Sequence, residues 1–450
     1  MAYTATLPFL GNLPPRAYPI VPFVGLGAVA SLLLVMRYPA VLLGAYAGGL
    51  FSYPSLFVPV QADPVRGWSL LPVVAVAMYL LTRRRRISLP VDAALLSQVA
   101  FATILLAGVA YTSGSTSNAL DKAWRFFYLS LFLFLASALF AGDTTRQRDI
   151  LASFTVGAVL WAVGVYLFGG YAYGRLGFEG LGGPIVYGRA CGVAATLMAC
   201  WILAKPTSVS VSIALPVGVF AVHGTVLSGT RGAVVAFLVA VLAVVLVSLS
   251  RGWTRAHLLI GCSILTGAVV LMANFVGKAP EELVARYVEL GQGTSGESAV
   301  GRLYLYSVAA RMLSESPLFG KGTGAYPAAL VYPHNIFLEV GAELGGVGLL
   351  ALFCLLTVTL IYVFRVFHSP GYSHFQKRMM LLLAGGFVFF LVEAQFSGDI
   401  TSNRMIWFFC GLICAVHATK GVPVAPAQLP SLPRRVGARR TREETAAFDP

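Results

Sequence analysis

The sequence predicts an all-α protein that crosses a membrane many times, and three observations support this fold class. Of the 450 residues, 58% are apolar and 11% are charged, whereas about a quarter of the residues of an ordinary soluble domain are charged. The mean hydropathy is +0.79. The apolar residues also gather in long runs, and about 20 such residues span a bilayer as a helix. These features exclude a soluble enzyme, a disordered chain and a collagen-like chain.

The apolar runs are the candidates for membrane-spanning helices, and we expect about twelve spans with a cytoplasmic N-terminus. The doubtful stretch is 20–60, where Pro39, Pro54 and Pro59 interrupt the run. It forms either two spans or one span with a broken or re-entrant piece. The runs lie at 20–36, 39–60, 68–82, 91–111, 123–141, 150–168, 186–204, 209–227, 232–249, 258–276, 336–364, 379–397 and 404–418.

The basic residues indicate which side of the membrane each loop faces. The formal net charge is +14, and two clusters stand out: Arg83–Arg86 after an apolar run, and several arginines in the tail at 419–450. Lysine and arginine gather in cytoplasmic loops, so both clusters belong inside. A surface for single-stranded nucleic acid needs aromatic residues between the basic ones. The two clusters have no such aromatic residues, so we expect no nucleic acid as a partner. Because the chain is predicted to span a membrane, we expect membrane lipids as partners.

The segment 277–335 is where a small water-facing domain can form. Pro280 followed by Glu281 predicts a helix start, because proline suits the first turn and acidic residues suit the positive end of the helix dipole. A second helix is predicted from about Ser298 to Ser314, and its apolar face is expected to carry Leu303, Tyr306, Ala310 and Leu313. The predicted division is transmembrane helices at 1–276, a periplasmic helical loop at 277–335, transmembrane helices at 336–418 and a basic cytoplasmic tail at 419–450.

On this topology several basic residues fall at the outer ends of spans, where lysine and arginine are normally rare. Charges in such places indicate a ligand. A guanidinium group can bind phosphate oxygens with two parallel hydrogen bonds, but it can equally anchor a helix end by reaching toward water. The candidates to bind an anionic group are Arg231, Arg302 and Arg175, with Arg189 and Lys321 as weaker ones.

His334 is the candidate general base. Histidine titrates near neutral pH and can take a proton from an alcohol within hydrogen-bond reach. His334 stands alone among the six histidines at the outer mouth of a span. The alternative is an interfacial histidine whose nitrogens bind water or backbone. Glu339, one turn into the following span, either orients His334 or complements the positive start of its helix.

The sequence predicts no metal and no cofactor. Lys321 lies in a glycine-rich stretch, Gly320–Gly324, that lacks the serine or threonine required directly after the lysine of a nucleotide-binding loop. The outer side has no Asp-x-Asp pair for a divalent cation. The six cysteines lie in apolar runs without the spacing of a zinc site. If a diphosphate binds, arginines must therefore neutralise it.

Three motifs in this order resemble the O-antigen ligase and polymerase superfamily, and the resemblance extends over about residues 170–410. Each motif alone is weak, but their order, their outer placement and the long loop between them are together fairly specific. The motifs are Ser228-Gly229-Thr230-Arg231-Gly232, then Gly301-Arg302 followed by Ser316–Gly322, and finally Pro333-His334-Asn335 with Glu339.

The resemblance implies an inner-membrane glycosyltransferase of about twelve spans, whose architecture is similar to that of other polyprenyl-dependent (GT-C-like) transferases. Such ligases move a glycan from undecaprenyl diphosphate to a sugar hydroxyl of lipid A-core on the periplasmic face, without metal or nucleotide. The matching positions imply that His334 is the base and that Arg231 and Arg302 bind the diphosphate. Arg175 matches less securely.

Three alternatives remain open at this stage. A polymerase of the same superfamily uses the same donor with a second lipid-linked glycan as acceptor. A protein O-oligosaccharyltransferase transfers the glycan to a protein. A transporter or flippase of an anionic lipid-linked glycan would instead line a path with the same arginines, although transporters usually show internal repeats, and the two halves of this chain show none that is convincing.

Overall fold

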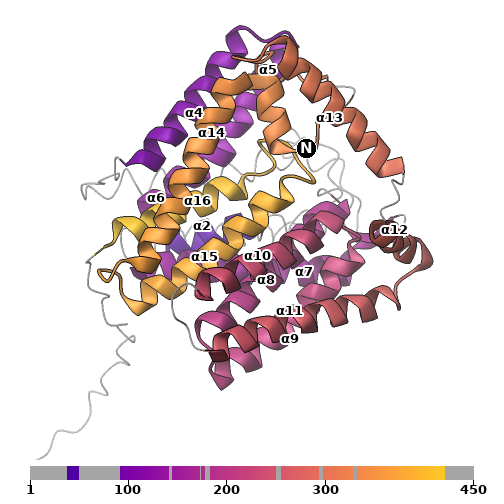
Figure 1. The fold of residues 1–450 in the computed structure, drawn as a ribbon, viewed down its shortest axis with the longest axis vertical. Coiled ribbons are helices and arrows are strands. Elements are labelled where there is room, and N and C mark those ends of the chain that lie inside the picture. The colour runs from indigo at the N-terminus through magenta and orange to yellow at the C-terminus, as the bar shows by residue number, and fades with distance from the viewer. Residues whose placement is uncertain are drawn as a thin grey trace, which may run out of the picture.

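The computed structural model describes residues 38–49, 92–140, 144–172, 174–177, 183–249, 255–292, 297–327, 330 and 332–420. Within these residues the chain folds into packed helices and one small hairpin (Figure 1). The hairpin pairs β1 (Gly170–Ala172) with β2 (Arg175–Gly177) in antiparallel register. Nine helices of the described part are long and apolar enough to cross a membrane. The prediction of an all-α polytopic membrane protein is therefore confirmed.

The helices of the described part follow the predicted apolar runs. From residue 92 onward every predicted run overlaps one helix or one continuous helical stretch. The helices are α2 (Pro39–Ala47), α4 (Ala93–Ala110), α5 (Thr116–Arg125), the π-helix η3 (Phe126–Leu131), α6 (Phe132–Phe140), α7 (Thr144–Phe168), α8 (Gly183–Ala204), α9 (Ser208–Leu227), α10 (Arg231–Leu249), α11 (Arg255–Val276), α12 (Glu281–Gln292), α13 (Glu297–Glu315), α14 (Ile336–His368), α15 (His374–Glu393) and α16 (Met405–Ala418).

Some predictions fall on residues outside the described part. Of the doubtful stretch 20–60, only residues 38–49 are described, and they contain the helix α2. The described part also leaves out the run at 68–82, the arginines Arg83–Arg86 and the tail from residue 421. The total of twelve spans and the GT-C-like architecture therefore stay predictions.

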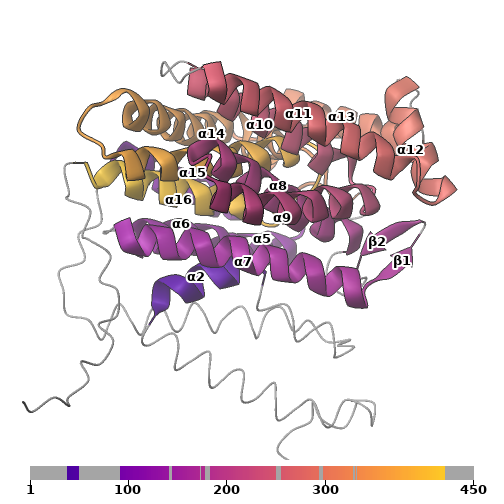
Figure 2. The ribbon, with the colours of Figure 1, turned by 90° about the horizontal axis from the view of Figure 1, so that it is seen from below.

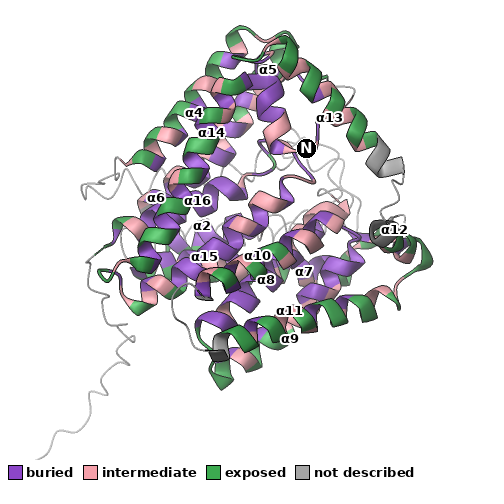
Figure 3. Ribbon diagram, viewed as in Figure 1, coloured by how far each residue is buried: buried purple, intermediate pink, exposed green. Residues whose placement is uncertain are grey.

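Residues are buried where the helices meet and exposed on the outer faces of the bundle (Figure 3). At the centre, Trp407 of α16 stacks on Phe101 of α4 at 5.3 Å and meets the edge of Phe126 at 5.4 Å. On the outside, Leu350 and Leu96 expose 65% and 59% of their surface. Exposed leucines of this kind suit contact with acyl chains, because lipid imposes no penalty on them.

The long helix α14 is interrupted at Gly345, whose φ of 65° lies in the left-handed region. The loop 317–322 fills the interruption. Its carbonyl groups at Pro317 and Leu318 accept hydrogen bonds from the backbone just after the break, and its amides donate to the carbonyls of Ala342 and Glu343 before it. Backbone groups inside a membrane protein must be paired. The loop provides that pairing and separates the residues 336–344 from the rest of α14.

Most of the predicted functional residues lie at one end of the bundle, which we call the site end. It consists of the described residues of the connections at 169–183, 228–230, 277–335 and 394–404. Successive spans run in opposite directions, so alternate connections meet at the same end. Figure 2 shows the β1–β2 hairpin and α12 together there, and Figure 1 shows α13 running along one edge from the region of α5 and α14 toward α12.

The two short helices predicted in 277–335 are present as α12, which starts directly after Pro280 as expected, and α13, whose two ends lie within one residue of those expected. The predicted apolar face of α13 is only partly right: Leu313 lies against Gly341 of α14 and Tyr306 donates to the carbonyl of Gln395, but Leu303 and Ala310 point outward. Leu303 is 62% exposed, whereas Ala309 is buried against Tyr326 and Ala342. Compared with the prediction, α13 turns Ala309 toward α14. The small side chain of Ala309 allows the two helices to approach closely.

Candidate active site

His334 lies directly before α14 in a backbone conformation that only glycine adopts easily. Its φ is 57°, and it is the one non-glycine residue with positive φ in the described part of the chain. The next residue, Asn335, caps the helix: its side-chain oxygen accepts hydrogen bonds from two backbone amides of the first turn, at 3.0 and 3.1 Å. The amide of Ile336 donates to the carbonyl of Ala394. The chain directly after the strained His334 is therefore held by three hydrogen bonds, and strained residues held in this way are typical of functional sites.

The imidazole of His334 is half-buried beside other polar groups of the site end. Its ring meets the ring of Tyr332 edge-on, with centroids 4.5 Å apart. Its Nδ1 atom is buried and has no hydrogen-bond partner within the described residues. Burial lowers the pKa of His334, and the positive charges of Arg302 and Arg189 lower it further. The imidazole is therefore neutral at neutral pH and can accept a proton.

Arg175 and Arg231 both adjoin one tight turn, 228–230. Nε of Arg175 donates to the carbonyl oxygen of Ser228 at 2.9 Å. Gly229 has a φ of 59°, and a Cβ atom there would come within 3.0 Å of the Arg175 side chain and 2.7 Å of Leu283 of α12. The glycine thus allows β2 and α12 to close over the turn. Arg231 follows as the first residue of α10.

Arg189 is held in place by a buried carboxylate. Its Nε lies 2.6 Å from Oε2 of Glu393, which is fully buried at the end of α15. Its Nη2 donates to the carbonyl of Ser397 at 2.9 Å and to the side chain of Asn403 at 3.0 Å. Much of this guanidinium group therefore fixes the connection 394–404, while its charge still acts on His334. The helix α8 also touches the turn 228–230, since a Cβ at Gly188 would lie 2.5 Å from the Ser228 hydroxyl.

Lys321 is separate from this group. Its ammonium lies 2.9 Å from Glu315, at the end of α13. Its backbone is bound to Ser113 and Ala342, in the loop that fills the break of α14. No interaction printed for Lys321 joins it to His334 or to the four candidate arginines within the described residues. Lys321 thus belongs to the site end but lies apart from the turn 228–230 and from the residues around His334.

Glu339 is fully buried on the first turns of α14, with both oxygens engaged. Oε1 accepts from Lys122 at 2.5 Å, and Oε2 accepts from the backbone amide of Ile400 at 2.9 Å. The predicted role of orienting His334 therefore stays a prediction, and any such effect runs through the start of α14 rather than through a hydrogen bond to the unpartnered Nδ1.

The sequence analysis missed Lys122 and Glu393 as residues of the site end. Both are charges inside or beside an apolar run, and a charge within a span needs a partner. That rule was the available signal, and the pair Glu339 and Glu343, four residues apart on one helix face, was a second sign that a cation lay opposite. In the described part of the chain no group of three or more histidine, cysteine or acidic residues could hold a metal ion.

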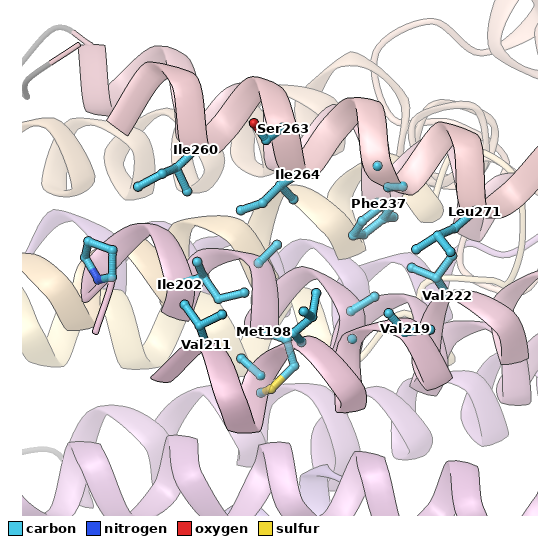
Figure 4. Close-up of a pocket in the computed structure, with 18 of the residues that line it drawn as sticks. Met198, Ile202, Val211, Val219, Val222, Phe237, Ile260, Ser263, Ile264 and Leu271 are labelled. Atoms are coloured by element: carbon cyan, nitrogen blue, oxygen red, sulfur yellow. The ribbon is translucent and has the colours of Figure 1, made fainter. Parts of the chain in front are cut away.

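An apolar cavity of about 450 Å³ lies elsewhere, between α8, α9, α10 and α11. Figure 4 shows its walls, which include Ile202 of α8, Val222 of α9 and Ile264 of α11. Ser263 supplies the one polar side chain of the lining. The cavity suits a hydrocarbon chain, but it has no group that could transfer a proton or bind a phosphate.

Comparison with known families gives one match to this chain. Residues 216–354 match a family model described as O-antigen ligase. The matched range runs from α9 into α14 and includes Arg231, Arg302 and His334, whereas Arg175 and Arg189 precede it. A comparison with curated proteins found no match.

Proposed function

From the similarity of residues 216–354 to the O-antigen ligase family, which bears out the resemblance drawn from the sequence motifs, we propose that this protein is an O-antigen ligase. It transfers a glycan from undecaprenyl diphosphate to a sugar hydroxyl of lipid A-core. The reaction takes place on the periplasmic face of the bacterial inner membrane, at the site end defined above. It requires neither ATP nor a metal ion.

The observation that carries the proposal is the state of His334. The imidazole is neutral because burial and two neighbouring arginines lower its pKa, and its position before α14 is fixed. As general base, His334 takes the proton of the acceptor hydroxyl. The oxygen then attacks the anomeric carbon of the donor, and the bond from that carbon to the diphosphate breaks. A single displacement inverts the configuration at this carbon.

The arginines bind the diphosphate and stabilise the negative charge that grows on it as it leaves. Arg231 and Arg175 support this role because they adjoin one turn, and Arg302 supports it because its charge reaches His334. Arg189 contributes charge, although Glu393 and the connection 394–404 hold much of its guanidinium group. For Lys321, paired with Glu315, the geometry offers no support.

The test is replacement of His334 by alanine. A general base contributes about 10²–10⁴-fold to a rate, so we expect His334→Ala to lose nearly all transfer while the protein stays folded and inserted. Purified protein in proteoliposomes is mixed with lipid-linked glycan and truncated lipopolysaccharide, and glycosylated lipid A-core is quantified. His374→Ala, at an exposed position at the opposite end of the bundle, is the control and should keep full activity. Full transfer by His334→Ala rules out the base role.

The product of the same assay separates the alternatives. Glycan on lipid A-core identifies a ligase, and a longer lipid-linked chain identifies a polymerase. Glycan on a protein identifies a protein O-oligosaccharyltransferase. Movement of the donor across the bilayer without any new bond identifies a transporter or flippase.

A further inference from the structure

Lys122 is a buried cation placed between two buried carboxylates. It lies on α5, and its Nζ is 2.5 Å from Oε1 of Glu339 and 2.7 Å from Oε1 of Glu343. The lysine side chain is 13% exposed, and the glutamate side chains are 0% and 1% exposed. We call these three residues the Lys122 cluster. Charges so far from water persist only when they are paired.

The remaining oxygens of the Lys122 cluster bind two loops. Oε2 of Glu339 accepts from the amide of Ile400, in the connection 394–404, at 2.9 Å. Oε2 of Glu343 accepts from the amide of Gly324, in the loop after α13, at 3.0 Å. One ammonium group thus joins α5, the first turns of α14 and two connections of the site end.

A third carboxylate, that of Asp399, interacts electrostatically with Lys122. Burial alone would raise the pKa of Asp399, but the charge of Lys122 and hydrogen bonds from Ser402 and Thr401 lower it below its ordinary value. Asp399 lies next to Ile400, so the connection that binds Glu339 also carries a charge attracted to Lys122. This connection binds the start of α14 a second time, through the carbonyl of Ala394.

Because α14 is broken at Gly345, the contacts of Glu339 and Glu343 with Lys122 and the loops determine where His334 lies. A continuous helix would fix its first turns through the turns that follow. Here the piece 336–344 is separated from the rest of α14, so its position depends on what touches it from the side. Glu339 and Glu343 both lie on this piece, and His334 precedes it by two residues.

We infer that Lys122 is a positioning residue for His334: by binding Glu339 and Glu343 together, it holds the piece 336–344 and therefore the imidazole in place. The consequence for catalysis rests on the proposed function. Misplacing a reacting group by about 1 Å can cost on the order of 10²-fold in rate. Lys122 does not touch the diphosphate in this scheme, so its loss should lower kcat and leave donor KM nearly unchanged.

The experiment compares three variants of the full chain in proteoliposomes. Lys122→Met removes the cation and leaves two buried carboxylates unpaired, so it is accompanied by the triple variant Lys122→Met/Glu339→Gln/Glu343→Gln, which removes all three charges. Lys122→Arg keeps a cation. Lys205→Met, at an exposed position between α8 and α9, is the matched control. For each we measure kcat, donor KM, Tm and the hydrogen exchange of backbone amides 334–340.

We expect Lys122→Met to lose about 10²-fold in kcat and to exchange the amides 334–340 faster than the wild type. Lys122→Arg should recover part of kcat. The triple variant should regain Tm but not kcat, because the backbone bonds from Ala394 and the loop 317–322 remain but the ion pairs that tie the piece 336–344 to α5 are gone. Lys205→Met should match the wild type.

Two results overturn the inference: wild-type kcat with unchanged exchange in Lys122→Met, or full recovery of kcat in the triple variant, which would mean that Lys122 only balances charge. A wild-type protein that transfers no glycan would refute the proposed function instead. In that event the exchange of amides 334–340 still decides whether Lys122 holds the piece.

Discussion

At the scale of single residues, the pKa of His334 predicts how activity depends on pH. Burial, Arg302 and Arg189 all disfavour the protonated imidazole, so the folded-state pKa lies below the ordinary value of about 6.5. The neutral form acts as the base, and it persists until the pH falls below that lowered pKa. We expect kcat/KM to stay level through neutral pH and to decline only on the acid side of about pH 6.5.

The variant Arg302→Met tests whether the charge of Arg302 lowers the pKa of His334. Removing one positive charge from the surroundings of His334 should raise its pKa and move the acid limb of the residual activity toward neutral pH. The measurement is kcat/KM against pH for wild type and variant at constant ionic strength. An acid limb that stays in place in the variant would contradict the electrostatic account.

Single residues also show where reasoning from sequence stops. His334 and the arginines were found because a charge at an outer helix end is unusual. Lys122 was not found because its function depends on Glu339 and Glu343, which are 217 and 221 positions away. Only packing brings such residues together.

At the scale of elements, the break in α14 predicts a large cost for any side chain at Gly345. Its φ of 65° disfavours other residues, and a Cβ atom would lie 2.4 Å from the carbonyl oxygen of Leu318. The strain alone costs on the order of 1–3 kcal/mol, because its ψ of −161° places Gly345 in a region that glycine alone adopts readily. The contact also requires the loop 317–322 to move. We expect Gly345→Ala to lower Tm and to reduce transfer. Thermal unfolding of the purified protein in detergent measures the first effect.

Gly267→Ala in α11 is the matched control. The glycine is helical, and no atom lies within 4 Å of the Cβ that alanine would add. Alanine is better than glycine in a helix by about 0.5–1 kcal/mol, so Tm should hold or rise. A Tm for Gly345→Ala equal to that of this control would show that the break tolerates a side chain.

Elements were the easiest part to predict. The helices from α4 onward follow the apolar runs, and α12 begins after Pro280 as expected. The face of α13 was predicted only in part, because apolar side chains on a helix that packs along the edge of a bundle do not all point inward. Leu303 and Tyr304 are both exposed, and the buried side was chosen by the fit of Ala309 against α14.

At the scale of the whole molecule, the proposed orientation predicts which end of the bundle faces the periplasm. Ser307 of α13 is exposed at the site end, and Lys205 is exposed at the opposite end. In intact cells a membrane-impermeant maleimide should label Ser307→Cys, and it should label Lys205→Cys only after the membrane is opened. The wild type, whose Cys262 and Cys354 are exposed, gives the background. The reverse pattern would place the site end in the cytoplasm and defeat the proposed function.

The sequence by itself determined that the chain is a bundle of membrane-spanning helices and which charges stand at its helix ends, because a bilayer accepts only long apolar segments and leaves every exception visible. The tertiary structure alone decided which partner each charged side chain has. Arg175 binds the turn 228–230, Arg189 binds Glu393, and Lys122 binds two glutamates of α14. Hydropathy is a property of each segment, whereas an ion pair depends on the distance between two segments, and that distance exists only once the helices have packed.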